Sequence, residues 1–293
     1  MRIVKLKGGL GNQMFQYAFA LNLKKTYKNE DILLDYSSYR CNEKCDDYKT
    51  SLLNYSIKLR PASKSEISHI CYLSHSTSSS FLTKAKVYAE SIINPHYLII
   101  RDSRYIPIKA LNEIHYFDGY WQSYKYIDSV SKELRKDFMP KGSISDNTIK
   151  MISKIKNNNY VFVGIRRGDY ITNFRAKKRY GNIGYNYYIN AMKKISQLVK
   201  NPIFLLFSNE IDWVKANWDF DGFNVHFREN DGTSDFEELL LMSSCRHAII
   251  ANSTFHWWGA WLIESPHKIV IGPRNWFING WPNNIMPPQW FSI

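Results

Sequence analysis

The sequence lacks several features that would assign it to a common class of protein. It has no apolar run of about 18 residues, so no transmembrane helix is expected. The N-terminus MRIVKLKGG reaches glycine too early for a signal peptide, which predicts a cytoplasmic chain whose four cysteines are reduced. No Walker lysine motif occurs, which argues against phosphoryl transfer from ATP. No helix carries a run of basic residues, which argues against nucleic acid as a partner.

Metal-binding patterns are also missing. The spacings Cys41-x3-Cys45 and His69-x-Cys71 match no usual zinc finger. Acidic D-x-D pairs, which hold a metal ion in many sugar transferases, are absent near the predicted strand ends that carry polar residues. The sequence therefore predicts no metal site, and cationic side chains would have to neutralise an anionic leaving group.

The chain is long, rich in aromatic residues and strongly basic. Its 293 residues are enough for two domains of ordinary size. Its 9 Trp and 20 Tyr can fill a core and line pockets for sugars or bases. The formal net charge of +13 calls for an anionic partner. With nucleic acid disfavoured, the candidates are a phosphorylated substrate and an anionic membrane surface.

The apolar pattern alternates between strands and helices. Strands are expected at 2–7, 31–35, 114–118, 160–165, 203–207, 225–227, 248–250 and 268–271. Helices are expected at 13–27, 123–135, 185–199, 210–218, 235–245 and 254–262. This alternation predicts an α/β protein with two doubly wound parallel sheets facing each other across a cleft. We expect domains at 1–142 and 143–272, with a tail at 273–293 that packs back on the N-terminal domain.

The most informative segment is a glycine turn between the first predicted strand and helix. Such a turn leaves backbone N–H groups free and lets a ligand approach the chain closely. The dinucleotide fingerprint fits Gly9 and Gly11 but lacks its third glycine. Asn12 and Gln13 stand where the helix begins. The turn is therefore predicted to hydrogen-bond a polar ligand.

Two arginines follow the predicted strand at 160–165. Arg166 and Arg167 come directly after it, and Asp169 stands two residues further on. Arginine is suited to a bidentate grip on phosphate, and Asp169 could orient one guanidinium. Such a motif alone is more often a surface ion pair. Its place at a strand end beside glycines favours a functional role.

Two more strand ends carry small polar residues. Ser208 and Asn209 follow the strand at 203–207, and Asn252 and Ser253 follow the strand at 248–250. Each pair can cap the next helix, and a helix N-terminus can also bind an anion. Four anion-friendly turns at strand ends of a basic protein predict a nucleotide diphosphate as ligand.

Four motifs together resemble those of the bacterial α-1,2-fucosyltransferases of glycosyltransferase family 11. They are GGLGNQMFQYA at 8–18, DGYWQS at 118–123, IRRGDY at 165–170 and NSTFHWWGAW at 252–261. Their order and spacing cover nearly the whole chain and are weakest between 36 and 104. The resemblance implies a GT-B fold and inverting, metal-free transfer of fucose from GDP-β-L-fucose without another cofactor. The implied acceptor is the 2-hydroxyl of a β-galactoside in a surface glycan such as an O-antigen or capsule repeat.

The resemblance also implies roles for single residues. Arg167 would neutralise the β-phosphate as GDP leaves, while Arg166 and Asp169 would hold the loop in shape. The implied donor-binding residues are Gly9, Gly11, Asn12, Gln13, Ser208, Asn209, Glu238, Ser253, Thr254 and Phe255. Of these, Glu238 would accept hydrogen bonds from guanine, and Asn12 would reach the diphosphate or the fucose across the cleft.

The chain departs from the family pattern at two positions. Gly164 stands where the family has a histidine, and Asn209 stands where it commonly has an aspartate. A transferase for another GDP-sugar is therefore the main alternative. Two further hypotheses are an oxidoreductase with Asp35 as its ribose ligand and a binding module that turns nothing over.

The general base is left open by the sequence. Asp169, Asp118, Glu238 and His256 are candidates, and a departing phosphate that takes the proton would need none of them. The net charge adds the hypothesis that the protein lies peripherally on the inner face of the cytoplasmic membrane, where a lipid-linked acceptor would be met.

Overall fold

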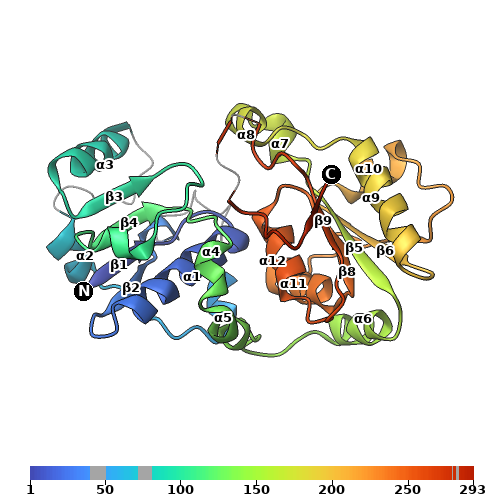
Figure 1. The fold of residues 1–293 in the computed structure, drawn as a ribbon, viewed down its shortest axis with the longest axis horizontal. Helices are drawn as coiled ribbons and strands as arrows, with labels where there is room; N and C mark the ends of the chain where they lie inside the picture. The colour runs from blue at the N-terminus through green and yellow to red at the C-terminus, as the bar shows by residue number, and fades with distance from the viewer. Residues whose placement is uncertain (40–50, 72–80, 279, 282–283) are drawn as a thin grey trace. The chain divides into compact units, whose positions relative to one another are not determined.

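The structure is a computed structural model that describes residues 1–39, 51–71, 81–278, 280–281 and 284–293 (Figure 1). The chain divides into two compact units, Met1–Lys141 and Gly142–Ile293. The predicted boundary at 142 differs from this division by one residue. Each unit is an α/β structure built on one parallel sheet, as the alternating pattern predicts.

The first unit contains a four-stranded sheet in the order β2-β1-β4-β3. Its strands are β1 (Arg2–Lys5), β2 (Ile32–Asp35), β3 (Tyr97–Ile100) and β4 (Tyr116–Gly119). Its helices are α1 (Leu10–Thr26), α2 (Lys64–Ile70), α3 (Phe81–Ile93), α4 (Lys125–Asp128) and α5 (Ser131–Asp137). Short 3-10 turns lie at Ser37–Tyr39, Ser51–Asn54 and Ile108–Leu111.

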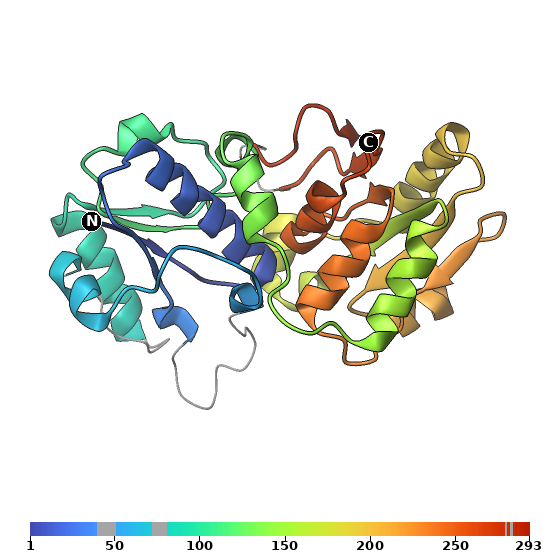
Figure 2. The ribbon, with the colours of Figure 1, turned by 90° about the horizontal axis from the view of Figure 1, so that it is seen from below.

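Helices cover the first sheet on both faces. Ile3 and Tyr116 of the strands pack in one apolar cluster with Ile67 and Ile70 of α2. The long helix α1, blue in Figure 2, lies across the sheet and contacts both β1 and β2. Burial of apolar residues on both faces explains why these short strands are nearly continuous hydrophobic runs.

The second unit contains a six-stranded sheet in the order β10-β9-β8-β5-β6-β7. Its strands are β5 (Tyr160–Ile165), β6 (Ile203–Ser208), β7 (Val225–Phe227), β8 (His247–Ile249), β9 (Val270–Gly272) and β10 (Phe291–Ser292). Its helices are α6 (Asp146–Lys156), α7 (Asp169–Thr172), α8 (Phe174–Tyr180), α9 (Tyr185–Leu198), α10 (Ile211–Asn217), α11 (Asp235–Ser244) and α12 (Thr254–Leu262).

The two faces of β5 have different helical partners. Val161 and Val163 pack in one cluster with Met192 and Ile195 of α9. Phe162 points the other way, toward Gly259 of α12. The helices α9 and α10 therefore lie on one side of the sheet, and α11 and α12 lie on the other (Figure 1).

The C-terminal tail departs from our prediction. It packs within the second unit, where β10 pairs with β9 as an edge strand. The indole Nε1 of Trp257 donates to the carbonyl of Ile285 at 2.8 Å, and its ring lies 5.2 Å from that of Trp290. The tail packs on the second unit because there it accepts a hydrogen bond from Trp257 and helps to bury the tryptophan-rich helix α12.

Both sheets contain a point where the strand order reverses. In the first sheet the chain goes from β1 to β2 on one side and later returns to place β4 on the other side of β1. In the second sheet it goes from β5 to β6 and β7, and then returns to place β8 on the other side of β5. Ligands of open α/β sheets bind at the carboxyl ends of strands at such switch points.

Candidate functional site

Three predicted segments meet at the carboxyl edge of the second sheet. The strand β5 is central, with β6 on one side and β8 on the other. Ile165 pairs in register with Ser208, and Val163 pairs with Ile249. The turns that follow these strands are therefore neighbours, and they carry the predicted Arg166–Asp169, Ser208–Asn209 and Ser253–Phe255 segments.

Arg167 is the most tightly held of the predicted residues. Only 9% of it is exposed, and its Nε donates to Oε2 of Glu210 at 3.2 Å. Its guanidinium carbon lies 3.2 Å from the ring centroid of Trp213. These contacts use one of its five N–H donors, and among the described residues the other four have no hydrogen-bond partner. Arg167 is thus a fixed cation that retains capacity for an anion.

Asn209 and Ser208 shape the turn beside Arg167. The backbone N–H of Arg167 donates to Oδ1 of Asn209 at 3.1 Å, and Gly168 (φ +36°) leaves room for the amide group of Asn209. Ser208 Oγ accepts from the backbone N–H of Glu210 at 3.1 Å. Both side chains thus support the loop on which Arg167 stands, and Asn209 is itself exposed.

Arg166 lies on the side of the loop that faces α12. Its guanidinium is 5.6 Å from the ring centroid of Tyr170, whose hydroxyl donates to the carbonyl of Asn252 at 3.0 Å. Asp169 is the first residue of α7, and its side chain lies outside what the structure describes. Tyr170 therefore joins the arginine loop to the segment that precedes α12.

The start of α12 differs in detail from the predicted cap. Ser253 is the N-cap residue but makes no capping hydrogen bond with its side chain. Asn252, the other predicted cap, donates instead to the carbonyls of Tyr180 and Trp276, at 2.7 and 3.2 Å. Thr254 and Phe255 are the first two residues of the helix. Without a serine cap, the first turn of α12 keeps the character of an anion-binding helix N-terminus.

Gly164 and His256 occupy adjacent space at this edge. A Cβ atom at position 164 would lie 2.5 Å from both Cγ and Nδ1 of His256, so the imidazole rests directly on the glycine backbone. His256 is buried, and its Nδ1 has no hydrogen-bond partner among the described residues. Burial, together with the charge of Arg166, lowers the pKa of His256 to about 3. An imidazole from α12 thus fills the space that the absent histidine at position 164 would need.

Glu238 has a cationic partner that the sequence did not suggest. It lies on α11, and its Oε1 is 3.0 Å from Nε of Arg228, which follows β7. Burial raises the pKa of Glu238 to about 7, and the charge of Arg228 only partly opposes this shift. A carboxylate that ionises near neutral pH can accept hydrogen bonds from a base such as guanine.

The predicted residues of the first unit lie around the start of α1. Gly9 is its N-cap and Gly11 is buried in its first turn. Asn12 Oδ1 accepts from Nε2 of Gln122 at 2.8 Å. Gln13 is fully buried and binds the backbone at both ends of its amide, donating to Gly8 and accepting from Leu52. Gln13 is therefore a structural residue of the turn.

A buried ion cluster at the same edge was not fully predicted. Asp118, at the end of β4, forms ion pairs with Lys7 and with Lys5, the latter at 3.4 Å. Burial acts to raise the pKa of Asp118, but the two lysines outweigh it and hold that pKa below its ordinary value. Asp118 is therefore a weak base, which argues against it as the group that takes a proton from the acceptor.

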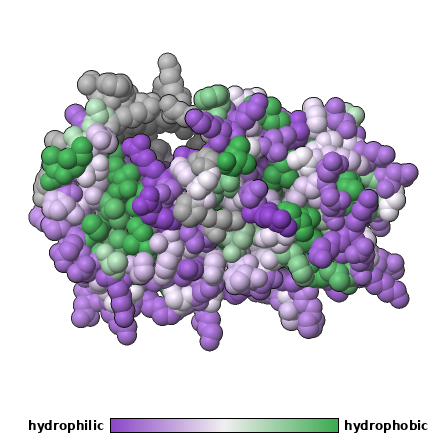
Figure 3. All heavy atoms as spheres, turned by 45° about the horizontal axis from the view of Figure 1, so that its top comes forward, coloured by the Kyte–Doolittle hydropathy of each residue, from purple (hydrophilic) through white to green (hydrophobic). Residues whose placement is uncertain are grey.

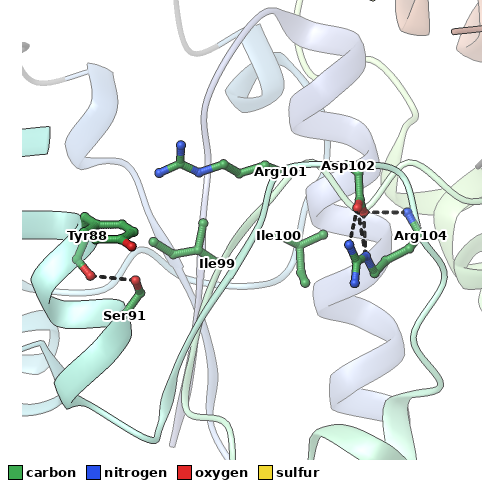
Figure 4. Close-up of a pocket in the computed structure, with 7 residues that line it drawn as sticks. All are labelled: Tyr88, Ser91, Ile99, Ile100, Arg101, Asp102 and Arg104. Atoms are coloured by element: carbon green, nitrogen blue, oxygen red, sulfur yellow. Dashed lines mark hydrogen bonds and ion pairs between the residues drawn. The ribbon is translucent and has the colours of Figure 1, made fainter. Parts of the chain in front are cut away.

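A hollow of about 320 Å³ lies in the first unit between α3 and the end of β3. Its lining residues are Tyr88, Ser91, Ile99, Ile100, Arg101, Asp102 and Arg104 (Figure 4). Arg104 pairs with Asp102 at 2.5 Å, whereas Arg101 forms no ion pair with the described residues. The hollow therefore combines apolar side chains with a cation that has no described counter-ion.

The described residues contain neither a cluster of metal ligands nor a membrane-spanning helix. In that part of the chain, no group of three or more His, Cys, Asp or Glu side chains could hold a metal ion. Cys41 and Cys45 lie outside the described residues, and Cys71 is buried. No described helix combines the length and the hydropathy needed to cross a bilayer.

Comparison with known proteins identifies the family to which these motifs belong. The sequence model of glycosyl transferase family 11 matches residues 1–292. The chain belongs to this family. Family 11 membership makes it a glycosyltransferase of the fucosyltransferase type and removes the oxidoreductase alternative.

Relatives of known function include two enzymes from Escherichia coli. An alpha-1,2-colitosyltransferase is 30% identical over 99% of this chain and 98% of its own length. The O-antigen biosynthesis glycosyltransferase WbnK is 28% identical over 98% of this chain and 99% of its own length. The human galactoside alpha-(1,2)-fucosyltransferase 1 is 23% identical over 60% of this chain and 51% of its own length.

A solved structure supports the fold. The crystal structure of POFUT1 in complex with GDP-fucose matches with a TM-score of 0.51 and 12% identity, over 92% of this chain and 97% of that one. The fold class is therefore α/β of the GT-B type, with two Rossmann-like units, as expected.

Proposed function

We propose that this protein transfers L-fucose from GDP-β-L-fucose to the 2-hydroxyl of a β-galactoside in a bacterial surface glycan. The observation that carries the proposal is Arg167, a buried and stacked cation with unused N–H donors. It follows β5, the strand at the switch point of the second sheet, and Tyr170 joins its loop to the segment before α12, whose N-cap serine makes no capping hydrogen bond. This pairing suits the diphosphate of a GDP-sugar. The family and the names of its relatives support a sugar transfer of this kind.

The reaction needs charge neutralisation more than a strong base. The bond between C1 of fucose and the β-phosphate oxygen breaks as the acceptor oxygen bonds to C1 from the opposite face, which inverts the configuration. The acceptor hydroxyl passes its proton to an oxygen of the departing β-phosphate, and GDP leaves with the bonding electrons. Arg167 would stabilise the charge that develops on the β-phosphate, in the role that a metal ion has in other transferases. We propose that no metal and no other cofactor is required.

The alternative is a different GDP-sugar on the same scaffold. Two observations favour it, namely the replaced residues Gly164 and Asn209 and a relative that is named a colitosyltransferase. Gly164 contacts His256 at the start of α12, and Asn209 contacts the backbone of Arg167. If GDP-colitose or GDP-mannose turned over faster than GDP-fucose, the alternative would replace the first proposal.

The test is release of GDP from GDP-L-fucose in the presence of EDTA, against a panel of β-galactosides that includes Galβ1,3GalNAc, Galβ1,3GlcNAc and lactose. We expect acceptor-dependent release, and NMR of the product should show an α linkage to the galactose 2-hydroxyl. Tight GDP binding without turnover of any GDP-sugar would instead support a binding module. Activity that returns only with added Mg²⁺ or Mn²⁺ would contradict the metal-free proposal.

We further propose peripheral contact with an anionic membrane through α3. Tyr88, Ile92 and Ile93 of this helix are 60%, 66% and 60% exposed, and Arg101 lines the hollow of Figure 4 together with Tyr88. Figure 3 shows exposed apolar side chains on the part of the first unit where Figure 1 has α3 and β3. Exposed aliphatic and aromatic groups beside cations suit a lipid surface of opposite charge.

Co-sedimentation with vesicles tests this contact. We expect binding to vesicles that contain phosphatidylglycerol, and weaker binding at high salt or after Ile92→Asp. The matched control is Ile149→Asp, because Ile149 of α6 is an aliphatic residue of similar exposure at 52%. Equal binding to neutral and anionic vesicles, or equal losses in the two variants, would contradict the proposal.

A further inference from the structure

The switch point of the first sheet contains a polar cluster that the proposed donor site does not use. Asp118 ends β4 and Lys5 ends β1, the two strands between which the chain order reverses. The side chain of Asp118 is only 7% exposed and lies between Lys5 and Lys7. The hydroxyl of Tyr97 also approaches it, at 3.4 Å. A buried carboxylate with two cations at this edge is a site of fixed geometry.

Hydrogen bonds fix the turns around this cluster. Gln16 Nε2 donates to the carbonyl of Gly119 at 3.1 Å, and the backbone N–H of Lys7 donates to Oε1 of Gln16 at 3.0 Å. Gln122 donates to Asn12 at 2.8 Å, so the turn after β4 is bound to the turn after β1. The turns that follow β1 and β4 are therefore held together by hydrogen bonds.

Backbone strain gives a second and independent observation. Trp121, in the turn after β4, has a φ of +54°, which is rare for a residue other than glycine. Its ring is 1% exposed and stacks on Phe19 at 3.9 Å, while its indole nitrogen has no hydrogen-bond partner among the described residues. Strain of this kind is retained where the surrounding structure requires a particular loop conformation, and such places are commonly binding sites.

The accessible part of the cluster has the chemistry of a sugar subsite. The side chain of Lys7 is 26% exposed, and its Nζ lies 4.9 Å from the ring centroid of Tyr120, which is half-buried. An ammonium group has three N–H donors, and the ion pair with Asp118 engages one of them. The remaining donors can bind sugar hydroxyls, while an aromatic ring can cover the apolar face of a pyranose.

We propose that Lys7 and Tyr120 bind the acceptor sugar, and that Asp118 is a positioning residue that holds the Lys7 ammonium in place. The ligand class is a pyranoside with adjacent hydroxyls, such as the galactoside of the proposed function, on which this inference rests. Lys7 donates to a sugar hydroxyl, and Tyr120 packs against the C–H face of the ring. Lys5 completes the charge balance around Asp118 from the less exposed side.

The decisive variants are Lys7→Met and Tyr120→Ala, with acceptor and donor KM measured separately. Each variant should raise the acceptor KM by about tenfold or more, the effect of one lost charge-assisted hydrogen bond or one lost stacking surface. The donor KM and the acceptor-independent hydrolysis of the donor should change by less than about twofold. Tyr120→Phe keeps the ring and should resemble the wild type. Lys132→Met is the matched control, because Lys132 is an exposed lysine of α5.

Asp118→Asn tests the positioning role. It keeps the shape of the side chain but removes the charge that holds Lys7, so the acceptor KM should rise while donor hydrolysis persists. A merely structural role would instead lower donor hydrolysis and acceptor binding together, or unfold the protein. An unchanged acceptor KM in both Lys7→Met and Tyr120→Ala would overturn the proposal.

Direct binding separates this inference from the proposed function. Calorimetric titration of β-galactosides into wild type and Lys7→Met needs no donor and no turnover. If the wild type binds a galactoside through Lys7 but releases no GDP from GDP-fucose, the subsite stands and the proposed donor is wrong. If GDP-fucose turns over normally and Lys7→Met binds galactosides as the wild type does, the subsite is wrong and the proposed function stands.

Discussion

The two switch points of this molecule occupy equivalent places in their sheets but contain ions of opposite sign. In the second unit the buried ion is a cation, Arg167, and its partner Glu210 is 36% exposed at the side chain. In the first unit the buried ion is an anion, Asp118, and its partners Lys5 and Lys7 are 18% and 26% exposed. The sheet topology places both sites, and the side chains decide what each can bind.

This difference has a direct chemical consequence. A buried guanidinium favours a dianionic diphosphate, because its N–H donors can form charge-assisted hydrogen bonds with the phosphate oxygens. Lys5, Lys7 and Asp118 together carry a net charge of +1, and the N–H donors of Lys7 that Asp118 does not engage can bind neutral hydroxyl groups. By our two proposals, one fold motif therefore binds the donor in the second unit and the acceptor in the first.

The largest effect should come from removing the cation of the second site. Arg167→Ala should lower kcat/KM for GDP release by about 10²–10³-fold, the loss typical of one stabilising group at a developing anion. Arg167→Lys should recover little, because a lysine cannot stack on Trp213 and bind two oxygens at once. The control is Arg246→Ala, at the opposite edge of the same sheet, where Arg246 bonds Asn159. A loss of less than about fivefold in Arg167→Ala would remove this residue from the site.

The contact between Gly164 and His256 should give the next largest effect. Gly164→Ala should lower the free energy of unfolding by about 1–3 kcal/mol, because its methyl group would overlap the imidazole. Adding His256→Ala should recover part of that loss by opening the space. Denaturant unfolding measures both changes, and Gly184→Ala is the control, since a Cβ there meets nothing within 4 Å. Equal stability of Gly164→Ala and Gly184→Ala would contradict the packing described.

Glu238 predicts a moderate pH dependence. Its pKa in the folded protein, about 7, lies above the ordinary 4.5 of a glutamate, so its contribution to stability is present below pH 4.5 and is lost as pH rises through 7. If Glu238 accepts hydrogen bonds from guanine, as we propose, only its ionised carboxylate can do so, and GDP affinity should rise between about pH 6 and 8. Calorimetry at several pH values measures this change, and Glu238→Gln should abolish it. A rise of equal size in Glu238→Gln would assign the titration to another group.

Asn209→Asp should have the smallest effect. Asn209 is exposed, and an aspartate keeps the oxygen that accepts from the N–H of Arg167. The donor KM should change by less than about threefold, because the added charge is screened by solvent. A larger change, or a switch in the preferred GDP-sugar, would make this position a determinant of donor choice.

The fold was predictable where periodicity is strong. The strands β5 and β7 and the helix α12 have the bounds expected from the sequence, because each is a compact apolar segment between polar residues. The helix α6 was missed, although Ser145 caps it and accepts from Thr148, a signal that short polar helices often carry. The strand β3 was missed because it lies in the region of weakest pattern.

The sequence predicted the glycines, the arginines and the helix start of the candidate site, but not the side chains that pair with its charged residues. Glu210 lies 43 residues from Arg167, and Arg228 pairs with Glu238 from another element. The spacing of residues in the sequence does not predict such pairs, because they form only when the sheet brings separate strand ends together. The contact between Gly164 and His256 is of the same kind. The sequence signals where a loop bends, whereas tertiary packing decides which side chains meet there.

The most direct test is a reciprocal binding experiment on the two switch points. GDP and a β-galactoside would each be titrated calorimetrically into the wild type, Arg167→Ala and Lys7→Met. The account predicts that Arg167→Ala loses GDP binding and keeps the galactoside, while Lys7→Met loses the galactoside and keeps GDP. Loss of both ligands in either folded variant, or loss of the same ligand in both, would contradict a division of donor and acceptor between the two sheets.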